Sequence, residues 1–213
     1  MHQLIKLSLK FSSVLAISSV LAISSVLASH SLASPSELIS QHECEACHGP
    51  NGVSSDTNIP TIAGIPEFNF FDQMLRYLEG RPSASVNHVY GDTSQKGDMV
   101  TIVKSLSEAQ IEELAKHYAG LEFVPAKQSF DQALAMKGKA IHAKSCENCH
   151  SDGGSNALDE ASILAGQQKG YLATTLQQFK QGKRSVDKKM DEAFKGLSSD
   201  DINALVEYYA SYR

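Results

Sequence analysis

The chain has 213 residues, of which 42% are apolar and 20% are charged, so it can build a buried core and is not a disordered protein. Its formal charge of −5 argues against nucleic acid as a partner, because an acidic surface repels phosphate backbones. It contains no Trp and few other aromatic residues, so aliphatic side chains, or a group that is not a side chain, must fill much of the core.

Residues 1–33 have the pattern of a secretory signal peptide. Lys6 and Lys10 give a basic start, an apolar stretch follows over residues 11–28, and Ser31-Leu32-Ala33 is a small-x-small cleavage sequence. An uncleaved membrane anchor is the alternative, but a spanning helix needs ~20 mostly apolar residues, and this stretch is shorter and rich in Ser. We therefore expect export to the periplasm and a mature chain that starts near Ser34.

Each half of the mature chain is predicted to contain three helical stretches. In chain order they cover 35–47, 67–79 and a helix that opens at Ser107, then 130–149, 171–181 and a helix that opens at Ser198. Ser is a good N-cap, and the acidic residues after these two Ser suit the positive end of a helix. Gly80 and Gly182 follow the middle helices, as Gly often does. No segment alternates with a period of two, so the expected fold class is all-α.

The two halves are copies of one another. Cys44-Glu45-Ala46-Cys47-His48 recurs 102 residues later as Cys146-Glu147-Asn148-Cys149-His150. Further along, a shift of 91 places Met99 on Met190 and Leu106-Ser107 on Leu197-Ser198, so the first copy has a surplus of 11 residues before its Met. Such a repeat predicts two tandem domains, 34–122 and 130–213, with a linker over 123–129.

The repeated C-x-x-C-H sequence is the attachment signature of a c-type haem. Two thiols three positions apart lie on one side of a helical turn and match the vinyl groups on one edge of the ring, while the next residue, His, is carried under the iron. The predicted cofactors are therefore two covalently bound haem c, held by Cys44, Cys47 and His48 and by Cys146, Cys149 and His150. The alternatives are a thioredoxin-like redox pair, a zinc site and two disulfides, none of which explains the His after each pair as well.

The sixth iron ligands are predicted to be Met99 and Met190, the two Met that coincide in the repeat. His/Met ligation is common in cytochromes c and raises the iron potential. Met74 lies mid-helix and is interpreted as core, and Met136 has no equivalent ligand role. His88, in the surplus of the first copy, is a rival ligand, although a lone loop His is more often solvated. With both irons six-coordinate no position is open to substrate, so we expect one-electron transfer, no catalytic residue and no enzyme.

Three further features concern the surroundings of the two haems. The Pro60 carbonyl is a candidate acceptor for the ring proton of His48, and Ser162 is the counterpart of Pro60 in the second copy. Three cations after the middle helices, Arg81, Lys183 and Arg184, are either partners of haem propionates or solvated charges. A basic run in this acidic protein is a candidate docking rim for a redox partner: Lys183, Arg184, Lys188 and Lys189.

The order C-x-x-C-H, Met and Leu-Ser helix, present twice, resembles the tandem class I cytochromes of the cytochrome c4 type over essentially the whole mature chain. The stretches 125–131, 146–150 and 163–167 more closely resemble the cytochrome subunit of flavocytochrome c sulfide dehydrogenase. The resemblance implies two class I cytochrome c domains related by a pseudo-two-fold axis. By the same resemblance, a flavin subunit oxidises sulfide and passes the electrons to the two haems of this chain.

The expected function is therefore that of a periplasmic dihaem electron-transfer protein, the electron-accepting cytochrome subunit of a flavocytochrome c. Its expected partners are a periplasmic flavoprotein dehydrogenase subunit and a downstream electron carrier or oxidase. The alternative is a free-standing cytochrome c4-like shuttle to a terminal oxidase, which differs in partner and not in chemistry. A two-haem enzyme, such as a peroxidase or a thiosulfate dehydrogenase, is a further alternative that requires one open or labile iron.

Overall fold

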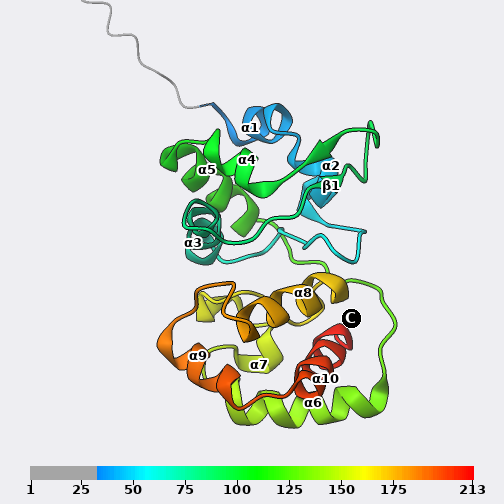
Figure 1. The fold of residues 1–213 in the computed structure, drawn as a ribbon. Helices are drawn as coiled ribbons and strands as arrows, with labels where there is room; N and C mark the ends of the chain where they lie inside the picture. Colours follow the sequence, from blue (N-terminus) through cyan, green and yellow to red (C-terminus); the bar gives the residue numbers. More distant parts are fainter. Residues whose placement is uncertain (1–32) are drawn as a thin grey trace, which may run out of the picture. The chain divides into compact units, whose positions relative to one another are not determined.

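The computed structural model describes residues 33–213, so the predicted signal peptide lies outside the described residues except for Ala33. None of the helices in this range is long and apolar enough to cross a membrane. Two hydrophobic cores, one for each copy of the repeat, organise this part of the chain. The structure is mostly helical, which confirms the all-α prediction, and Figure 1 shows the helices in chain order.

The first domain surrounds one core. Its helices are α1 (Pro35–Gln41), α2 (Cys44–His48), the 3-10 turn η1 (Pro50–Gly52), α3 (Glu67–Leu78), α4 (Met99–Lys104) and α5 (Glu108–Ala119). Ser34 and Ser107 form capping boxes on α1 and α5, so the N-cap predicted at Ser107 is confirmed. The core consists of Leu38, Phe70, Met74, Val103, Leu106, Ile111, Leu114, Ala115 and Tyr118.

The second domain repeats this order with a longer first helix. Its helices are α6 (Gln132–Ser145), α7 (Ser151–Gly154), the 3-10 turn η2 (Ala157–Asp159), α8 (Lys169–Lys180), α9 (Lys188–Lys195) and α10 (Ser199–Ala210). Ser198 caps α10, as predicted. The core consists of Leu172, Leu176, Phe194, Leu197, Ile202, Leu205, Val206, Tyr208 and Tyr209.

Helix α6, the longest among the described residues, packs across α10 (Figure 1). Gly138 lies at the crossing, where an added Cβ would be 2.0 Å from the carbonyl oxygen of Ala204. The contact is therefore between backbone and backbone, and only a residue without a side chain permits it.

The predicted helix through each C-x-x-C-H motif is interrupted. Between α1 and α2, Glu43 takes a left-handed conformation (φ 50°), and in the second copy α6 ends at Ser145, so that residues 146–150 form turns. The short helices α4 and α9, which carry the candidate Met ligands, were not predicted. Asp98 and Asp187 cap them, and these cap hydrogen bonds help to stabilise helices that are too short to be stable alone.

The surplus of the first copy forms a β-hairpin, which the sequence did not predict. Strand β1 (Val86–Asn87) pairs antiparallel with β2 (Lys96–Gly97). Each strand has two residues, too few to show an alternating pattern. At the tip, the Asp92 carboxylate accepts hydrogen bonds from the backbone and hydroxyl of Ser94 and closes the turn. Residues 85–97 are called the surplus hairpin below.

Two glutamines of the second domain hold a loop of the first. The buried Gln167 amide makes two hydrogen bonds to Thr61: the Thr61 N–H donates to Oε1 at 2.9 Å, and Nε2 donates to the Thr61 carbonyl at 2.9 Å. Gln168 Nε2 donates to the Ser54 carbonyl at 2.7 Å. Because buried amides need such partners, the two side chains fix the loop that follows the first motif.

Candidate haem sites

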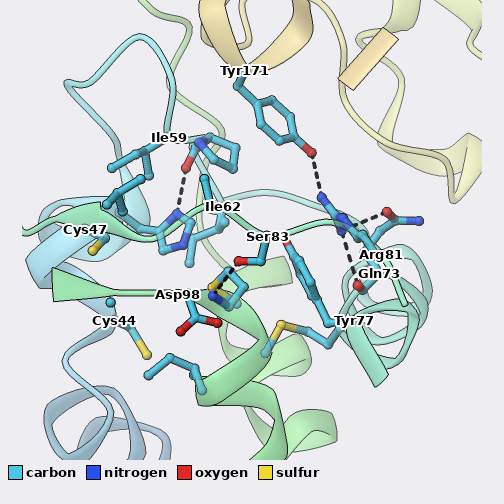
Figure 2. Close-up of a pocket in the computed structure, with 18 of the residues that line it drawn as sticks. Cys44, Cys47, Ile59, Ile62, Gln73, Tyr77, Arg81, Ser83, Asp98 and Tyr171 are labelled. Atoms are coloured by element: carbon cyan, nitrogen blue, oxygen red, sulfur yellow. Dashed lines mark hydrogen bonds between the residues drawn. The ribbon is translucent and has the colours of Figure 1, made fainter. Parts of the chain in front are cut away.

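One cavity brings together the residues predicted to bind the first haem. Cys44, Cys47 and His48 of α2 line it, and so does Met99 at the start of α4. Figure 2 shows Cys44 and Cys47 on the same side of this cavity. Its walls also include the apolar side chains Ile59, Ile62, Phe70, Ile102, Leu106 and Leu114. Apolar walls with sulfur and imidazole groups on one side suit a flat hydrophobic macrocycle that is held at one edge.

The structure holds His48 as a neutral imidazole with one nitrogen available. The predicted hydrogen bond is present: the Nδ1–H group donates to the Pro60 carbonyl at 2.9 Å. Burial lowers the pKa of the His48 ring, and the Pro60 carbonyl opposes this effect. A carbonyl only accepts, so Nδ1 carries the proton and Nε2 is left as a metal ligand.

The cysteines are thiols in both motifs, and none of the four is in a disulfide. Burial raises the pKa of Cys44 to about 11, and burial raises the pKa of Cys47 as well.

The two candidate Met ligands occupy equivalent places in the structure. Each lies in the first turn of a short helix, is partly buried and packs against the core of its own domain. The Met99 N–H donates to Ser83 Oγ at 2.9 Å, and the Met190 N–H donates to Asp187 Oδ1 at 3.1 Å. Met74 is core, as interpreted from the sequence, and Met136 is 65% exposed.

The second motif presents the same residue types with weaker support. Burial lowers the pKa of His150, and the backbone of Ser162, the counterpart of Pro60, opposes this effect. The His150 Nδ1 atom is nevertheless buried without a hydrogen bond. Cys149 is exposed and Cys146 is partly buried. The ring of the second candidate iron ligand is thus less firmly oriented than that of the first.

His88 is not the solvated loop residue that its position in the sequence favoured. Its side chain is 7% exposed and lines the same cavity as His48 and Met99. A Cβ built on Gly97 would be 3.6 Å from His88 Nε2 and 3.9 Å from Cys47 Sγ. His88 therefore approaches the site from the side of Cys47, and Met99 remains the predicted sixth ligand.

Two guanidinium groups line this cavity with neutral hydrogen-bond partners in the described chain. Arg184 donates to Gln73 Oε1 at 2.7 Å and to Thr175 Oγ1 at 3.0 Å. Arg81 donates to Gln73 Oε1 at 3.0 Å and to the Tyr171 hydroxyl at 3.3 Å (Figure 2). Burial raises the pKa of Tyr171, but the two cations outweigh burial and lower it to about 8. A buried cation, Arg184, and a half-buried one, Arg81, that have no carboxylate partner among the described residues fit a ligand that carries carboxylates, as haem does.

Arg184 must also be removed from the predicted docking rim. Its side chain is 7% exposed and points into the protein, because Gln73 of the first domain supplies a polar partner there. The sequence pattern Lys183-Arg184 does not reveal this, since that partner lies 111 positions away in the chain.

The Met assignment predicts a spectroscopic change. Replacing Met190 with Ala is expected to open the second iron to carbon monoxide, because the side chain at the sixth position is lost. Carbon monoxide difference spectra of the reduced holoprotein measure this. Met136→Ala removes an exposed Met of the same domain and should leave the spectrum unchanged. Carbon monoxide binding, or a high-spin haem, in the unaltered protein would contradict the assignment.

Known proteins resemble the chain at the level of sequence. A family model described as "Cytochrome C oxidase, cbb3-type, subunit III" matches residues 133–208. Cytochrome c4 of Azotobacter vinelandii is 28% identical over 178 residues, which cover 78% of this chain and 82% of the relative. A "Thiosulfate dehydrogenase electron acceptor" of Stutzerimonas stutzeri is 24% identical over 172 residues, which cover 79% of this chain and 78% of the relative.

A solved structure extends the similarity to the fold. Reduced recombinant cytochrome c4 from Pseudomonas stutzeri matches with a TM-score of 0.66 at 26% identity, over 86% of this chain and 100% of the other. The two tandem cytochrome c domains predicted from the repeat are thereby confirmed, and the cytochromes c4 are electron-transfer proteins and not enzymes. In its motifs, fold and relatives the chain is therefore similar to the two-domain class I cytochromes c of the cytochrome c4 type.

Proposed function

We propose that this protein is a free-standing periplasmic electron carrier with two covalently attached haem c. The observation that carries the proposal is the first cavity, where two cysteines, an oriented neutral His and a Met line one apolar space. The second domain has the same four residue types at equivalent positions of the repeat, and Met190 packs against its core. The periplasmic location rests on the cytochrome c4 relatives and on the signal-peptide pattern of residues 1–33.

The residues divide into attachment and ligation. Cys44 and Cys47 would attach the first haem and Cys146 and Cys149 the second, while the axial iron ligands would be His48 with Met99 and His150 with Met190. The bound iron supplies exchange of one electron between its ferric and ferrous forms. The protein's own part is to orient the His48 ring through Pro60, to exclude water with apolar walls and to balance negative charge with Arg81 and Arg184.

The relatives favour the free-standing carrier over a flavocytochrome subunit, reversing the order expected from the sequence. Those reported above are cytochromes c4 and an electron acceptor of thiosulfate dehydrogenase. We therefore propose a soluble or membrane-bound oxidase, or a further carrier, as the electron acceptor. As electron donor we propose a dehydrogenase of reduced sulfur compounds. A flavoprotein donor is supported only by the resemblance of the stretches 125–131, 146–150 and 163–167.

The test is a haem count combined with a redox titration of the exported protein. Mass measurement under denaturing conditions should show two haem additions. The titration should show two reversible one-electron steps, and both irons should be low-spin in the ferric and in the ferrous form. Fewer than two additions would overturn the cofactor assignment. An iron that stays high-spin and reacts with peroxide would instead support the two-haem enzyme.

A further inference from the structure

The two motifs differ in what covers their second cysteine. Cys149 is exposed, whereas its counterpart Cys47 is partly buried. The surplus hairpin belongs to the first domain alone, since α8 and α9 of the second domain are joined by residues 181–187, which contain no strand. The difference between the two cysteines therefore coincides with a large difference between the two copies, the presence of the surplus hairpin in the first copy only.

The surplus hairpin is hydrogen-bonded to the first motif itself. The N–H groups of Val89 and Tyr90 both donate to the Ala46 carbonyl, at 2.7 Å and 3.0 Å. This carbonyl is free because its partner in a helix is the residue four positions later, which is Pro50 and has no N–H. The Tyr90 hydroxyl adds a hydrogen bond of 2.7 Å to Ser55. The hairpin thus binds an acceptor that lies between the two cysteines.

His88 is the residue of the surplus hairpin whose side chain lies near Cys47. Its buried imidazole and the Cys47 sulfur both lie within 4 Å of the position of a Cβ on Gly97. Val86 and Lys96 of the two strands line the same cavity, and Figure 2 shows the strands running past Cys44 and Cys47. The hairpin is therefore packed against the side of the site where the haem would be attached.

We propose that the surplus hairpin covers the attached edge of the first haem, so that electrons enter and leave this protein at the Cys149 edge of the second domain. The inference rests on the proposed carrier function. A partner must approach a haem edge closely to exchange an electron, and the hairpin places two strands between a partner and the first site. Each exchange moves one electron: a reduced partner is oxidised as the second domain is reduced, and the first domain then reoxidises the second.

The partner that fits the exposed edge is a redox protein with an acidic face. Lys183, Lys188 and Lys189 are exposed in the segment that leads into Met190, and the Lys188 side chain is 89% exposed. Its nearest acidic partner, Glu192, is 4.0 Å away, so the ammonium group is only weakly paired. Such charges raise the rate of encounter with an acidic partner and orient it.

Deletion of residues 85–95 tests the cover. It leaves Ser83, which holds Met99, and Asp98, which caps α4, and gives the first copy the same spacing from Gly to Met as the second. His88→Ala with Tyr90→Ala removes the covering side chains without shortening the chain. Thr93→Ala at the exposed tip is the control.

Accessibility is measured on the holoprotein by the broadening of haem thioether proton signals in the presence of a soluble inert nitroxide. The signals of the first haem are identified by their loss in a variant without Cys44 and Cys47. In the unaltered protein and in Thr93→Ala the second haem should be broadened several-fold more than the first. In the deletion and in the double variant the two should be broadened alike.

Stopped-flow reduction by an acidic one-haem cytochrome gives the second readout. Lys188→Glu with Lys189→Glu should slow it about tenfold at low salt, within the range by which association rates vary among variants of one interface, and less at high salt. Equal broadening of both haems in the unaltered protein, or broadening that the deletion does not change, would overturn the cover. If no partner reduces either haem reversibly, it is the proposed function that fails.

Discussion

Replacing Cys44 and Cys47 with Ala is expected to remove the first covalent haem and to unfold the first domain. The site lies against the core residues Phe70 and Leu114, so without its haem the domain keeps an apolar cavity that water or collapse must fill. Such cavities cost several kcal/mol, of the order of the whole stability of a domain. The measurements are the mass of the denatured protein and the loss of helical circular dichroism on heating.

Replacing Cys146 and Cys149 with Ala is the matched control for this prediction. It should remove one haem from the other domain and leave the first domain folded, with its low-spin spectrum. A variant without Cys44 and Cys47 that still carries two covalent haems would contradict the attachment sites. One that loses a haem but unfolds like the unaltered protein would show that the first core does not depend on the cofactor.

Replacing Gly138 with Ala is expected to destabilise the second domain by about 3 kcal/mol or more, the upper part of the range for overpacked sites. The new methyl group would meet the Ala204 carbonyl carbon and oxygen at 2.6 Å and 2.0 Å, and these backbone atoms of α10 cannot move aside as a flexible side chain does. The free energy of unfolding follows from urea titrations monitored at the second haem.

Gly196→Ala provides the control, because it is the same chemical change in open space. Nothing lies within 4 Å of a Cβ at Gly196, and its φ of −84° is ordinary for Ala. This variant should be as stable as the unaltered protein or about 0.5 kcal/mol more stable, since Ala restricts the unfolded chain. If Gly138→Ala unfolds at the same urea concentration as Gly196→Ala, the α6–α10 crossing is not the constraint that we infer.

Local signals predicted the parts of this fold that depend on neighbouring residues. The sequence predicted the N-caps at Ser107 and Ser198, the middle helices and the His48–Pro60 hydrogen bond. In each of these features the interacting residues are at most 12 positions apart in the chain. The helices α4 and α9 were missed, although Asp98 and Asp187 give each a recognisable N-cap, because six to eight residues are too few for a clear helical period.

The features that the sequence did not reveal depend on residues far apart in the chain. Burial of Arg184 requires Gln73, and burial of His88 requires a hairpin that binds the Ala46 carbonyl. Neither partner is visible in a local pattern, because a long-range contact leaves no periodicity in the sequence. The free Ala46 carbonyl was also missed, although the sequence carries a local signal for it: Pro50, four positions later, has no N–H that could donate to this carbonyl.

The hydrogen bonds of Gln167 and His48 meet in a single peptide group. The carbonyl of Pro60 and the N–H of Thr61 belong to the same amide plane; the first accepts from His48 Nδ1 and the second donates to Gln167 Oε1. Hydrogen bonds at the two ends of one amide polarise it and strengthen each other. The electron-donating power of His48, the proposed axial ligand of the first iron, would therefore be set partly by Gln167 of the other domain. A first domain expressed alone would lack Gln167, so the reduction potential of its iron would differ from that of the same iron in the whole chain.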